Sequence, residues 1–596
     1  MKGKTGFLVP AMAFLLLLTA CGGNKSKPGA DISISPTTAN ALVGESRTFT
    51  VTTQTDFTLS APAGAGCVKT NNTVTCTPTT AGTHDITVRA TVDSSKDATA
   101  RITVHLPPFE ADMLTLTPGR TTSEIGVTWH GASEDGVSGR VKYAPKAEMI
   151  DHEFPSSAEV VDAISTDAYT GRVSHKATLT GLSPDTEYVY TVSGNGTDYS
   201  RSFTYKTPAT GNFSFVAVGD PQLTDTGVTP PDDEAVPPTP GGYMEKNHNK
   251  TTVWGWLETV NALLRDVPDV GLIISSGDQA DRNLIGGNPE GRLDEHMPKY
   301  ANFLAPDALR SLPFAPAVGN HEARSNLSFL YHYNLPNQVI VPEANRVITS
   351  ESARSGRESM QIMQNLGHYY YLYNNALFVV LNSSARVDDI NQANAMAAIF
   401  DGVLSAATTA YVGQYDWLFV HHHKTTVGLA DHAADTDIQY YVEAGFELLM
   451  LQYGVDVVFA GHDHIYSRSL PVQASSAVGN INGVAFDRSK TGDINQGDGT
   501  VFFTMNSSSG QKFYEEFVPA ITNNGDYPYL MDGTRGSAGL MAGTLPWSIN
   551  VYHQEYKPMF LGIDVADSVI TIKAYEVQDN GSTNVVDTFI ITKTID

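Results

Sequence analysis

Three apolar runs in the C-terminal two-thirds of the chain each end in a short polar block. The runs FSFVAV, GLIISS and VDVVFA are continuous and short, a pattern typical of fully buried strands. A single glycine separates each run from a side chain that can bind a metal, namely Asp220, Asp278 or His462. Because open α/β sheets bind ligands beyond the carboxyl ends of their strands, we expect these side chains to meet at one sheet edge.

Between these runs the apolar residues take helical spacing. The segments TVWGWLETVNALLRDV (252–267) and YYVEAGFELLMLQYG (440–454) predict helices. Buried strands mixed with helices predict an α/β domain over 211–596. Two polar stretches, about 224 to 250 and about 471 to 500, each follow a metal-type block and predict surface loops.

The N-terminal third alternates apolar and polar residues with a period of two. SRTFTVTT, HDITVRATV and ATARITVHL predict a β-sandwich over 31–106, and SGRVKYAP with GLSPDTEYVYTV predicts a second one over 109–208. Two prolines, Pro107 and Pro108, mark the linker between them. The first segment resembles bacterial immunoglobulin-like domains, and the second resembles fibronectin type III domains such as the N-terminal domain of purple acid phosphatase-like proteins.

Residues 1–20 have the composition of a secretory signal peptide. Two lysines precede the apolar stretch Phe7–Leu18, and Leu-Thr-Ala then precedes Cys21. This last block resembles a bacterial lipobox, which implies lipidation of Cys21 and a polar tether over 21–30; a signal peptide with an incidental cysteine is the alternative. We therefore expect an exported protein, lipid-anchored to the bacterial cell envelope and facing the periplasm or the cell surface.

Cysteine content and charge narrow the possibilities. Besides Cys21 the chain has only Cys67 and Cys76, which outside the cytoplasm predict a local disulfide, with two free thiols as the alternative. The formal net charge is −26, which repels nucleic-acid backbones, so we expect no nucleic-acid binding. An anionic substrate would need bound cations to supply a local positive field.

Five polar blocks follow one another along the α/β segment. They are Gly219-Asp220-Pro221-Gln222, Gly277-Asp278-Gln279-Ala280-Asp281-Arg282, Gly319-Asn320-His321-Glu322, His421-His422-His423 and Gly461-His462-Asp463-His464. Carboxylates, an amide and imidazoles in this mixture suit two hard or borderline cations.

The order of these blocks resembles the calcineurin-like metallophosphoesterase superfamily and, within it, the purple acid phosphatase-like proteins. The resemblance implies a four-layered αββα domain that hydrolyses phosphoric esters, here as an acid phosphatase-like phosphomonoesterase with two divalent or trivalent ions of iron, manganese or zinc. The chain departs from the pattern at Gln222, where the family usually has histidine. It also departs at Asp281, where purple phosphatases carry the tyrosine that gives their colour.

The resemblance also implies the metal ligands. The first ion would take Asp220, Gln222, Asp278 and His464, and the second Asp278, Asn320, His423 and His462. Asp278 would bridge, because two ions about 3.5–4 Å apart share a ligand. His423 is expected rather than His422, because the family's ligand lies six residues after a tryptophan, here Trp417. Gln222 offers only a weak amide oxygen, or none.

Three residues have implied catalytic roles. His321 would protonate the leaving oxygen, Asp281 would hold the tautomer of its ring, and Arg282 would bind phosphate oxygens. A surface arginine is the alternative for Arg282. The segment NSSSGQK (506–512) follows the strand TVFFTM and recurs in bacterial relatives, without an assigned role, and Asp463 also has none.

The expected substrate is a phosphorylated small molecule or a nucleotide. A phosphodiesterase or nucleotidase of the same fold is the nearest alternative, because monoesterases and diesterases share all five blocks. A non-catalytic surface adhesin or scaffold is the distant one. Retention of all the implied ligand positions except the histidine replaced by Gln222 favours catalysis.

Overall fold

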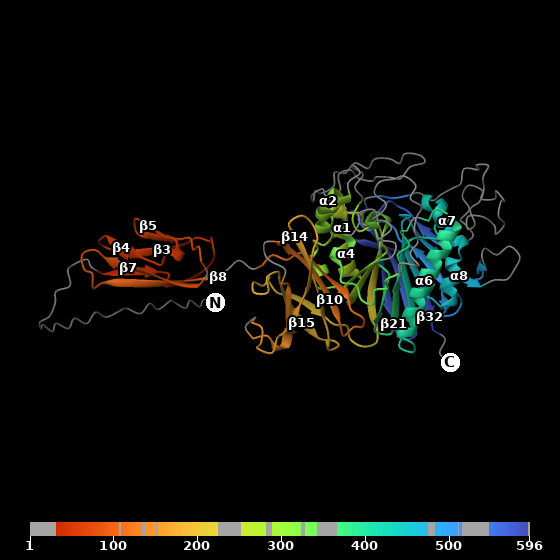
Figure 1. The fold of residues 1–596 in the computed structure, drawn as a ribbon, viewed down its shortest axis with the longest axis horizontal. Coiled ribbons are helices and arrows are strands. Elements are labelled where there is room, and N and C mark those ends of the chain that lie inside the picture. The colour runs from red at the N-terminus through yellow and green to blue at the C-terminus, as the bar shows by residue number, and fades with distance from the viewer. Residues whose placement is uncertain are drawn as a thin grey trace, which may run out of the picture. The chain divides into compact units, whose positions relative to one another are not determined.

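The computed structural model divides into two compact units, Met1–Pro108 and Phe109–Asp596, each described by itself (Figure 1). The predicted signal peptide, the tether and Cys21 lie outside the described residues. The structure describes residues 31–80, 82–105, 109–133, 138–150, 153–224, 252–281, 289–323, 328–341, 366–385, 387–474, 483–510, 512–514 and 548–593.

The first unit is a β-sandwich of two four-stranded sheets, ordered β1-β3-β6-β5 and β2-β8-β7-β4. Apolar side chains from both sheets, including Phe49 and Ile102, share one core. The strands are β1 Ile32–Ser35, β2 Thr38–Leu42, β3 Arg47–Thr53, β4 Phe57–Ser60, β5 Cys67–Thr70, β6 Thr73–Cys76, β7 Gly82–Ala90 and β8 Asp97–His105.

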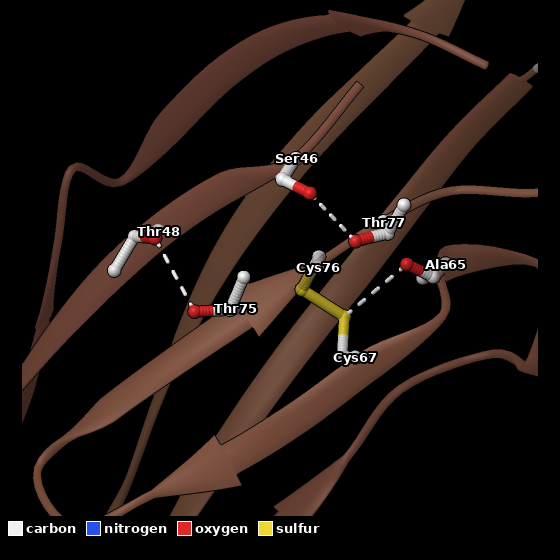
Figure 2. The surroundings of a disulfide bond; sticks show 7 residues. All are labelled: Ser46, Thr48, Ala65, Cys67, Thr75, Cys76 and Thr77. Atoms are coloured by element: carbon white, nitrogen blue, oxygen red, sulfur yellow. Dashed lines mark hydrogen bonds between the residues drawn. A yellow bond between two sulfur atoms is a disulfide. The ribbon is translucent and has the colours of Figure 1, made fainter. Parts of the chain in front are cut away.

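A disulfide joins Cys67 and Cys76, which lie directly opposite each other on the antiparallel strands β5 and β6 (Figure 2). Cys76 is fully buried in the core of the sandwich. The side chains of Thr48 and Thr75 are hydrogen-bonded beside it. The disulfide therefore cross-links the edge strand β5 to β6 in the first sheet.

The second unit begins with another sandwich of two four-stranded sheets, ordered β13-β14-β10-β9 and β12-β11-β15-β16. Trp129 and Tyr190 are fully buried in its core. The strands are β9 Asp112–Pro118, β10 Ile125–Ala132, β11 Arg140–Pro145, β12 Glu159–Asp162, β13 Ile164–Asp167, β14 Arg172–Leu179, β15 Glu187–Ser193 and β16 Phe203–Lys206.

This second sandwich and the following α/β part form one compact unit. The hydroxyl of Tyr190 donates to the backbone oxygen of Arg310 at 2.6 Å. The Thr117 hydroxyl donates to the backbone oxygen of Asn334 at 2.7 Å. The segments predicted as separate domains thus share a hydrogen-bonded interface.

The α/β part contains two seven-stranded mixed sheets, ordered β19-β18-β17-β30-β31-β32-β27 and β20-β21-β22-β23-β28-β24-β29. The first contains β17 Phe213–Val218, β18 Val270–Ser275, β19 Phe314–Pro316, β27 Ile494–Asn495, β30 Met559–Val565, β31 Val569–Val577 and β32 Thr583–Thr592. The second contains β20 Tyr369–Tyr373, β21 Ala376–Val380, β22 Trp417–Lys424, β23 Val457–Gly461, β24 Tyr466–Ser469, β28 Val501–Thr504 and β29 Ile549–His553.

Aromatic rings fill the space between the two sheets. Phe215 of β17 meets Phe378 of β21 and Phe419 of β22 edge to face, with ring centroids 5.2 and 5.3 Å apart. Helix α1 (Thr252–Asp266) contacts β30 and β31, whereas α6 (Ile390–Ala410) contacts β20 and β21. The order of layers is therefore helix, sheet, sheet, helix, as Figure 1 shows.

The helix predicted over 440–454 is in fact two helices. Helix α7 (Thr436–Glu443) ends before Gly445, and α8 (Phe446–Gln452) begins after it. Gly445 has a φ of +84°, and a residue in this left-handed conformation cannot continue a helix. The remaining helices are α2 Pro289–Phe303, α3 Asn320–Ala323, α4 Ser328–His332, and the 3₁₀ helices η1 Ala63–Ala65, η3 Lys146–Glu148, η4 Asp307–Arg310 and η6 Asp431–Ala434. Within the described residues, no helix combines the length and apolarity needed to cross a membrane.

The polar stretch 471–500, predicted as a surface loop, contains three short strands in its described part. β25 (Val472–Ala474) pairs with β26 (Val484–Phe486), and β27 adds to the edge of the first sheet beside β32. The described part of this stretch is held by backbone hydrogen bonds between strands, which a polar composition does not predict. Most of the other predicted loop, 225–250, lies outside the described residues.

Candidate metal centre

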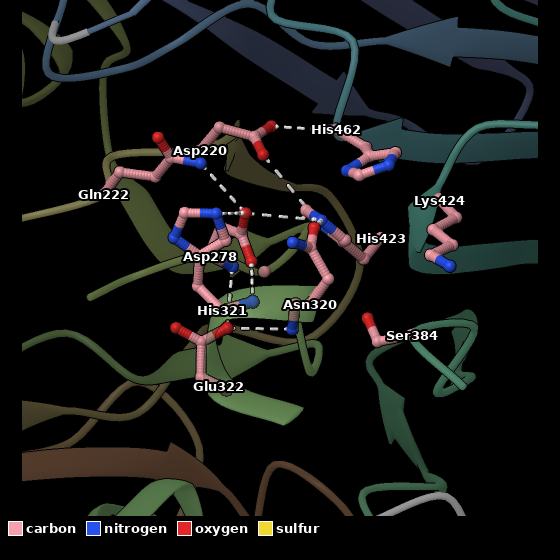
Figure 3. A network of polar contacts seen from close by, with 12 residues as sticks. Asp220, Gln222, Asp278, Asn320, His321, Glu322, Ser384, His423, Lys424 and His462 are labelled. Atoms are coloured by element: carbon pink, nitrogen blue, oxygen red, sulfur yellow. Dashed lines mark hydrogen bonds and ion pairs between the residues drawn. The ribbon is translucent and has the colours of Figure 1, made fainter. Parts of the chain in front are cut away.

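The carboxyl ends of the parallel strands of both sheets lie at the same edge of the α/β part. In the first sheet β17, β18 and β19 run parallel and are followed by Asp220, Asp278 and Asn320. In the second sheet β22 and β23 run parallel and deliver His423 and His462. Figure 3 shows these side chains pointing toward one another.

Tight backbone geometry makes this convergence possible. Asp220 and Asp278 have φ values of +46° and +53°, and His462 has +74°, so each adopts the left-handed conformation. A Cβ on Gly319 would lie 2.0 Å from Oδ1 of Asp278, and one on Gly461 would lie 2.3 Å from Oδ2 of Asp220. Gly319 and Gly461 are therefore required for the close approach of the loops that carry these side chains.

Asp278 is the centre of the cluster. Its Oδ1 accepts from the backbone N–H of His321 at 2.8 Å, and its Oδ2 accepts from Nε2 of Gln222 at 2.9 Å. Oδ2 also lies 3.5 Å from Nε2 of His423. Burial raises the pKa of Asp278, but the neighbouring His321 and His423 rings and these hydrogen bonds outweigh it, so the pKa lies below its usual value.

The structure distinguishes between the adjacent histidines of the triplet. Nε2 of His423 lies 2.7 Å from Oδ1 of Asn320, and its Nδ1 lies 3.0 Å from the backbone oxygen of Ser276, which orients the ring. His422 points to the other face of the strand, where its ring meets Phe446 at 4.8 Å. Only His423 of these two faces the cluster.

His462 completes a three-residue donor set. Donor atoms of Asp278, His423 and His462 lie within 4.8 Å of one another, and all three residues are buried. A second such group joins His462 to His432 and Asp435. The His432 ring stacks on His462 with centroids 4.0 Å apart, and its Nδ1 lies 2.8 Å from Oδ2 of Asp435.

The other side of the cluster has an incompletely satisfied carboxylate. Oδ2 of Asp220 accepts from the backbone N–H of His462 at 2.9 Å. Among the described residues Oδ1 has no hydrogen-bond partner, and it lies 3.5 Å from Nε2 of His464. Burial raises the pKa of Asp220 to about 7. A cation beside Oδ1 would remove this cost of burial.

Gln222 directs its amide nitrogen into the cluster. Nε2 lies 2.9 Å from Oδ2 of Asp278 and 3.3 Å from Nε2 of His464, both of which can accept a hydrogen bond. In this arrangement the amide of Gln222 donates to Asp278, and its role as a metal ligand stays a prediction. His464 is held from behind, because its Nδ1 donates to the backbone oxygen of Lys512 at 2.8 Å.

His321 and Asp281 form a pair at the rim. Nδ1 of His321 lies 2.9 Å from Oδ1 of Asp281, and Nε2 lies 3.6 Å from Oδ2 of Asp278. Lys299 donates to the backbone oxygen of Asp281 at 3.0 Å and so fixes this loop. Arg282, predicted to bind phosphate, lies outside the described residues.

Glu322 organises the cluster, although no role for it was predicted from the sequence. This buried carboxylate accepts from the backbone N–H groups of Asp278 and Gly319, each at 2.8 Å, and from that of Ala280 at 3.1 Å. Burial raises its pKa well above the usual range. Through these hydrogen bonds Glu322 connects the loop of Asp278 with that of Asn320. In the sequence, the position of Glu322 directly after His321 was the one feature that could have indicated this role.

Asp463 and the 506–512 segment are also supports. Asp463, between His462 and His464, accepts from the backbone N–H groups of Ala430 at 2.8 Å and His432 at 3.0 Å. Ser507 donates to the backbone oxygen of Asp220 at 3.0 Å. Neither role can be read from sequence, because each contact joins distant segments.

Comparison with known families identifies the chain. A model for the purple acid phosphatase N-terminal domain matches residues 112–207, and the model of calcineurin-like phosphoesterases matches residues 213–466. The chain thus contains a calcineurin-like metallophosphoesterase domain at residues 213–466. It is therefore a hydrolase acting on phosphoric esters, with the domain order of purple acid phosphatase-like proteins.

Relatives of this metallophosphoesterase extend the picture. The uncharacterized proteins MT2654 and Rv2577 of two Mycobacterium tuberculosis strains are each 24% identical to it over 502 residues, covering 80% of this chain and 86% of theirs. The solved structure of purple acid phosphatase PPD1 from yellow lupin seeds covers 95% of this chain and 96% of its own at 15% identity, with a TM-score of 0.50. At this identity the likeness shows the fold alone.

The donor set of this metallophosphoesterase fits metal ions. Buried carboxylates, imidazoles and an amide oxygen converge, and Oδ1 of Asp220 has no hydrogen-bond partner among the described residues. Such a mixture of donors suits iron, manganese or zinc. Without cations, close carboxylates such as Asp220 and Asp278 would repel each other at this burial.

Proposed function

We propose that this protein is a phosphomonoesterase of the acid phosphatase type that uses two metal ions. One observation carries the proposal: Asp278 lies between two groups of donors. On one side are His423, His462 and Asn320, and on the other are His464 and Asp220. A carboxylate placed in this way suits a bridging ligand.

The ligands would divide as the family pattern implies. Asn320, His423 and His462 would hold one ion with Asp278, and Asp220 and His464 would hold the other with it. When bound, the ions lower the pKa of water toward neutrality and offset the charge of the phosphoryl group. The hydrogen bond from Gln222 to Asp278 keeps the shared carboxylate oriented.

His321 would act as the general acid. Its Nδ1 is held by Asp281, which leaves Nε2 to carry the proton toward the leaving oxygen of the substrate. Asp281 orients the ring in the same way that a carboxylate orients the histidine of other hydrolases. Loss of the leaving alkoxide is easier when it departs as a neutral alcohol.

The setting of the enzyme is also a proposal. The signal-like first segment and Cys21 support an exported protein with a lipid anchor in the bacterial cell envelope, facing the periplasm or the cell surface. The substrate would be a phosphorylated small molecule or a nucleotide. The formal charge of −26 supports the absence of nucleic-acid partners.

The test combines metal analysis with a substrate panel on the purified chain. We expect two metal ions per chain, loss of activity with chelators, and faster turnover of p-nitrophenyl phosphate than of bis(p-nitrophenyl) phosphate. Faster turnover of the diester would assign the protein as a phosphodiesterase instead. Active protein without bound ions and insensitive to chelators would overturn the proposed function.

A further inference from the structure

Helix α2 is packed against α1, α4 and strand β9 of the second sandwich. Tyr300 of this helix stacks on His332 of α4 with ring centroids 4.0 Å apart, and Phe303 stacks on Trp256 of α1 at 5.0 Å. The indole N–H of Trp256 also donates to the backbone oxygen of Phe303 at 2.9 Å. The C-terminal half of α2 is therefore fixed by packing against two other helices.

Two polar side chains of α2, one turn apart, reach loops of the metal centre. The ammonium group of Lys299 donates to the backbone oxygen of Asp281 at 3.0 Å. Nδ2 of Asn302 donates to the backbone oxygen of Thr224 at 2.9 Å. Residues three apart in a helix lie on the same face. This face of α2 therefore holds two loops, each of which begins at an aspartate of the metal centre.

Asp281 is held on both sides of its backbone, and its side chain orients His321. Its N–H donates to the backbone oxygen of Leu223 at 2.9 Å, and its own oxygen accepts the bond from Lys299. Its Oδ1 lies 2.9 Å from Nδ1 of His321. The other ring nitrogen, Nε2, lies 3.6 Å from Oδ2 of Asp278, so the ring points toward the centre (Figure 3). Fixing the backbone of Asp281 limits the positions that its carboxylate, and with it the ring, can take.

The bond from Lys299 to Asp281 lies inside the protein. The Lys299 side chain is buried, so little water can replace it as the donor. Hydrogen bonds from a charged donor are stronger than those between neutral groups. Loss of the ammonium group would therefore release the backbone of Asp281 on one side, without altering any of the implied metal ligands.

We propose that Lys299 is a positioning residue for proton donation by His321 and acts through the backbone of Asp281. The inference rests on the proposed phosphomonoesterase function and deepens it, because it identifies what holds the general acid in place. When the P–O bond of the ester breaks, its electron pair stays on the leaving oxygen, which takes the proton from Nε2 of His321. The phosphoryl group passes to water, which gives inorganic phosphate and the free alcohol, and the ring is left neutral. A ring displaced by about 1 Å transfers this proton poorly.

The test compares two monoesters on the metal-loaded full chain. The leaving group of p-nitrophenyl phosphate departs without a proton, whereas the alkoxide of glycerol 2-phosphate needs one. Lys299→Met should lower kcat for glycerol 2-phosphate about tenfold and kcat for p-nitrophenyl phosphate less than about threefold. Lys299→Arg, which keeps a charged donor, should retain both values within a few-fold. The ratio of the two kcat values in one sample does not depend on the fraction of folded protein, so it stays valid for a less stable variant.

Lys176→Met is the matched control. Lys176 of β14 also donates through its ammonium group to a backbone oxygen, that of Leu330 in α4. This bond joins the second sandwich to α4 and does not involve Asp281. The ratio of the two kcat values in Lys176→Met should therefore equal that of the unmodified protein, and metal content should be the same in both lysine variants. An equal change of the ratio in both variants would leave Lys299 with a structural role only.

A double substitution decides whether Lys299 acts through His321. In the His321→Ala background, Lys299→Met should cause no further loss with glycerol 2-phosphate, because the proton donor is already absent. Additive losses, equal losses for both esters, or an unchanged ratio in Lys299→Met would each overturn the inference. Failure of the proposed function is distinct from these outcomes, because it shows in the unmodified protein as absent metal or absent monoesterase activity.

Discussion

Two clusters of buried histidines in the described part of the second unit differ in their neighbours, and the one at the sheet edge has the carboxylates of a candidate metal centre. At the sheet edge, His423 and His464 face the carboxylates of Asp278 and Asp220 at 3.5 Å. Between the second sandwich and the α/β part, His130 and His332 are equally buried but face aromatic rings.

The interface cluster is held by stacking and by single hydrogen bonds. His332 stacks on Tyr300 with centroids 4.0 Å apart and on His130 at 4.7 Å, and its Nε2 lies 2.6 Å from the Tyr169 hydroxyl. Nε2 of His130 donates to the backbone oxygen of Tyr331 at 3.1 Å. No carboxylate pairs with either histidine among the described residues. Burial lowers both pKa values.

The comparison shows that burial of histidines does not by itself make a metal centre. The neutral rings at the interface stabilise packing between two segments, and unpaired Nδ1 atoms there cost stability. At the sheet edge, carboxylates supply the negative charge that ions need. The carboxylates should therefore control metal content, and the interface histidines should not.

The largest effect is expected from Asp278→Asn. Removing the charge of the shared ligand should abolish binding of both ions and reduce kcat/KM by at least about a thousandfold, because all metal-dependent stabilisation is lost. Metal analysis and turnover of p-nitrophenyl phosphate measure this. His130→Phe is the matched control from the other cluster and should keep its ions; loss of metal in that variant would break the comparison.

The next largest effect is expected from His321→Ala. The ions should remain, because the ring is not among the implied ligands and the backbone N–H that holds Asp278 is unchanged in the variant. Turnover of esters with poor leaving groups should fall roughly 10²–10⁴-fold, the usual contribution of a general acid. Esters with good leaving groups should be affected far less. Equal losses for both kinds of ester would remove His321 from the proton-donating role.

A pH effect of intermediate size is expected from the interface cluster. Burial lowers the pKa of His130 to about 3, whereas the unfolded chain should titrate near about 6.5. As pH falls below about 6.5 the unfolded state takes up the proton first, so stability is full above that pH and is lost toward pH 3. At pH 5 the loss is about 2 kcal/mol of the free energy of unfolding.

Denaturant unfolding at pH 7 and pH 5 measures this loss. The free energy of unfolding of His130→Phe should fall less between these two pH values than that of the unmodified protein, because one titrating group is gone. The absolute stability of the variant is not the readout, since the bond to Tyr331 is also lost. Identical pH slopes would show that His130 does not titrate on unfolding.

The smallest effect is expected from Gln222→His, a substitution within the candidate metal centre. A ring nitrogen in place of the amide would add a donor beside Asp220 and His464. We expect affinity for the first ion to rise by about tenfold, within the range for changes around a metal site. Competition with a chelator measures it, and weaker binding would show that the hydrogen bond from Gln222 to Asp278 matters more.

Much of the fold and of the candidate metal centre was predictable from the local pattern of apolar and polar residues along the chain. The run FSFVAV coincides with β17, and the glycine before each ligand marks the end of a strand. Glu322 and His432 were not predictable, because their contacts with the cluster join distant segments. Glu322, for example, binds the backbone of Asp278 in another loop. The break at Gly445 could have been predicted, since glycine often ends helices.

The pairing of β17 with β30 has a consequence for shortened forms of the enzyme. β17 carries the first ligand loop, yet one of its edges is covered by a strand from the last part of the chain. A chain that lacks β30 would leave that edge open, and open edges favour pairing with other chains. We therefore expect a protein truncated before Met559 to be prone to aggregation.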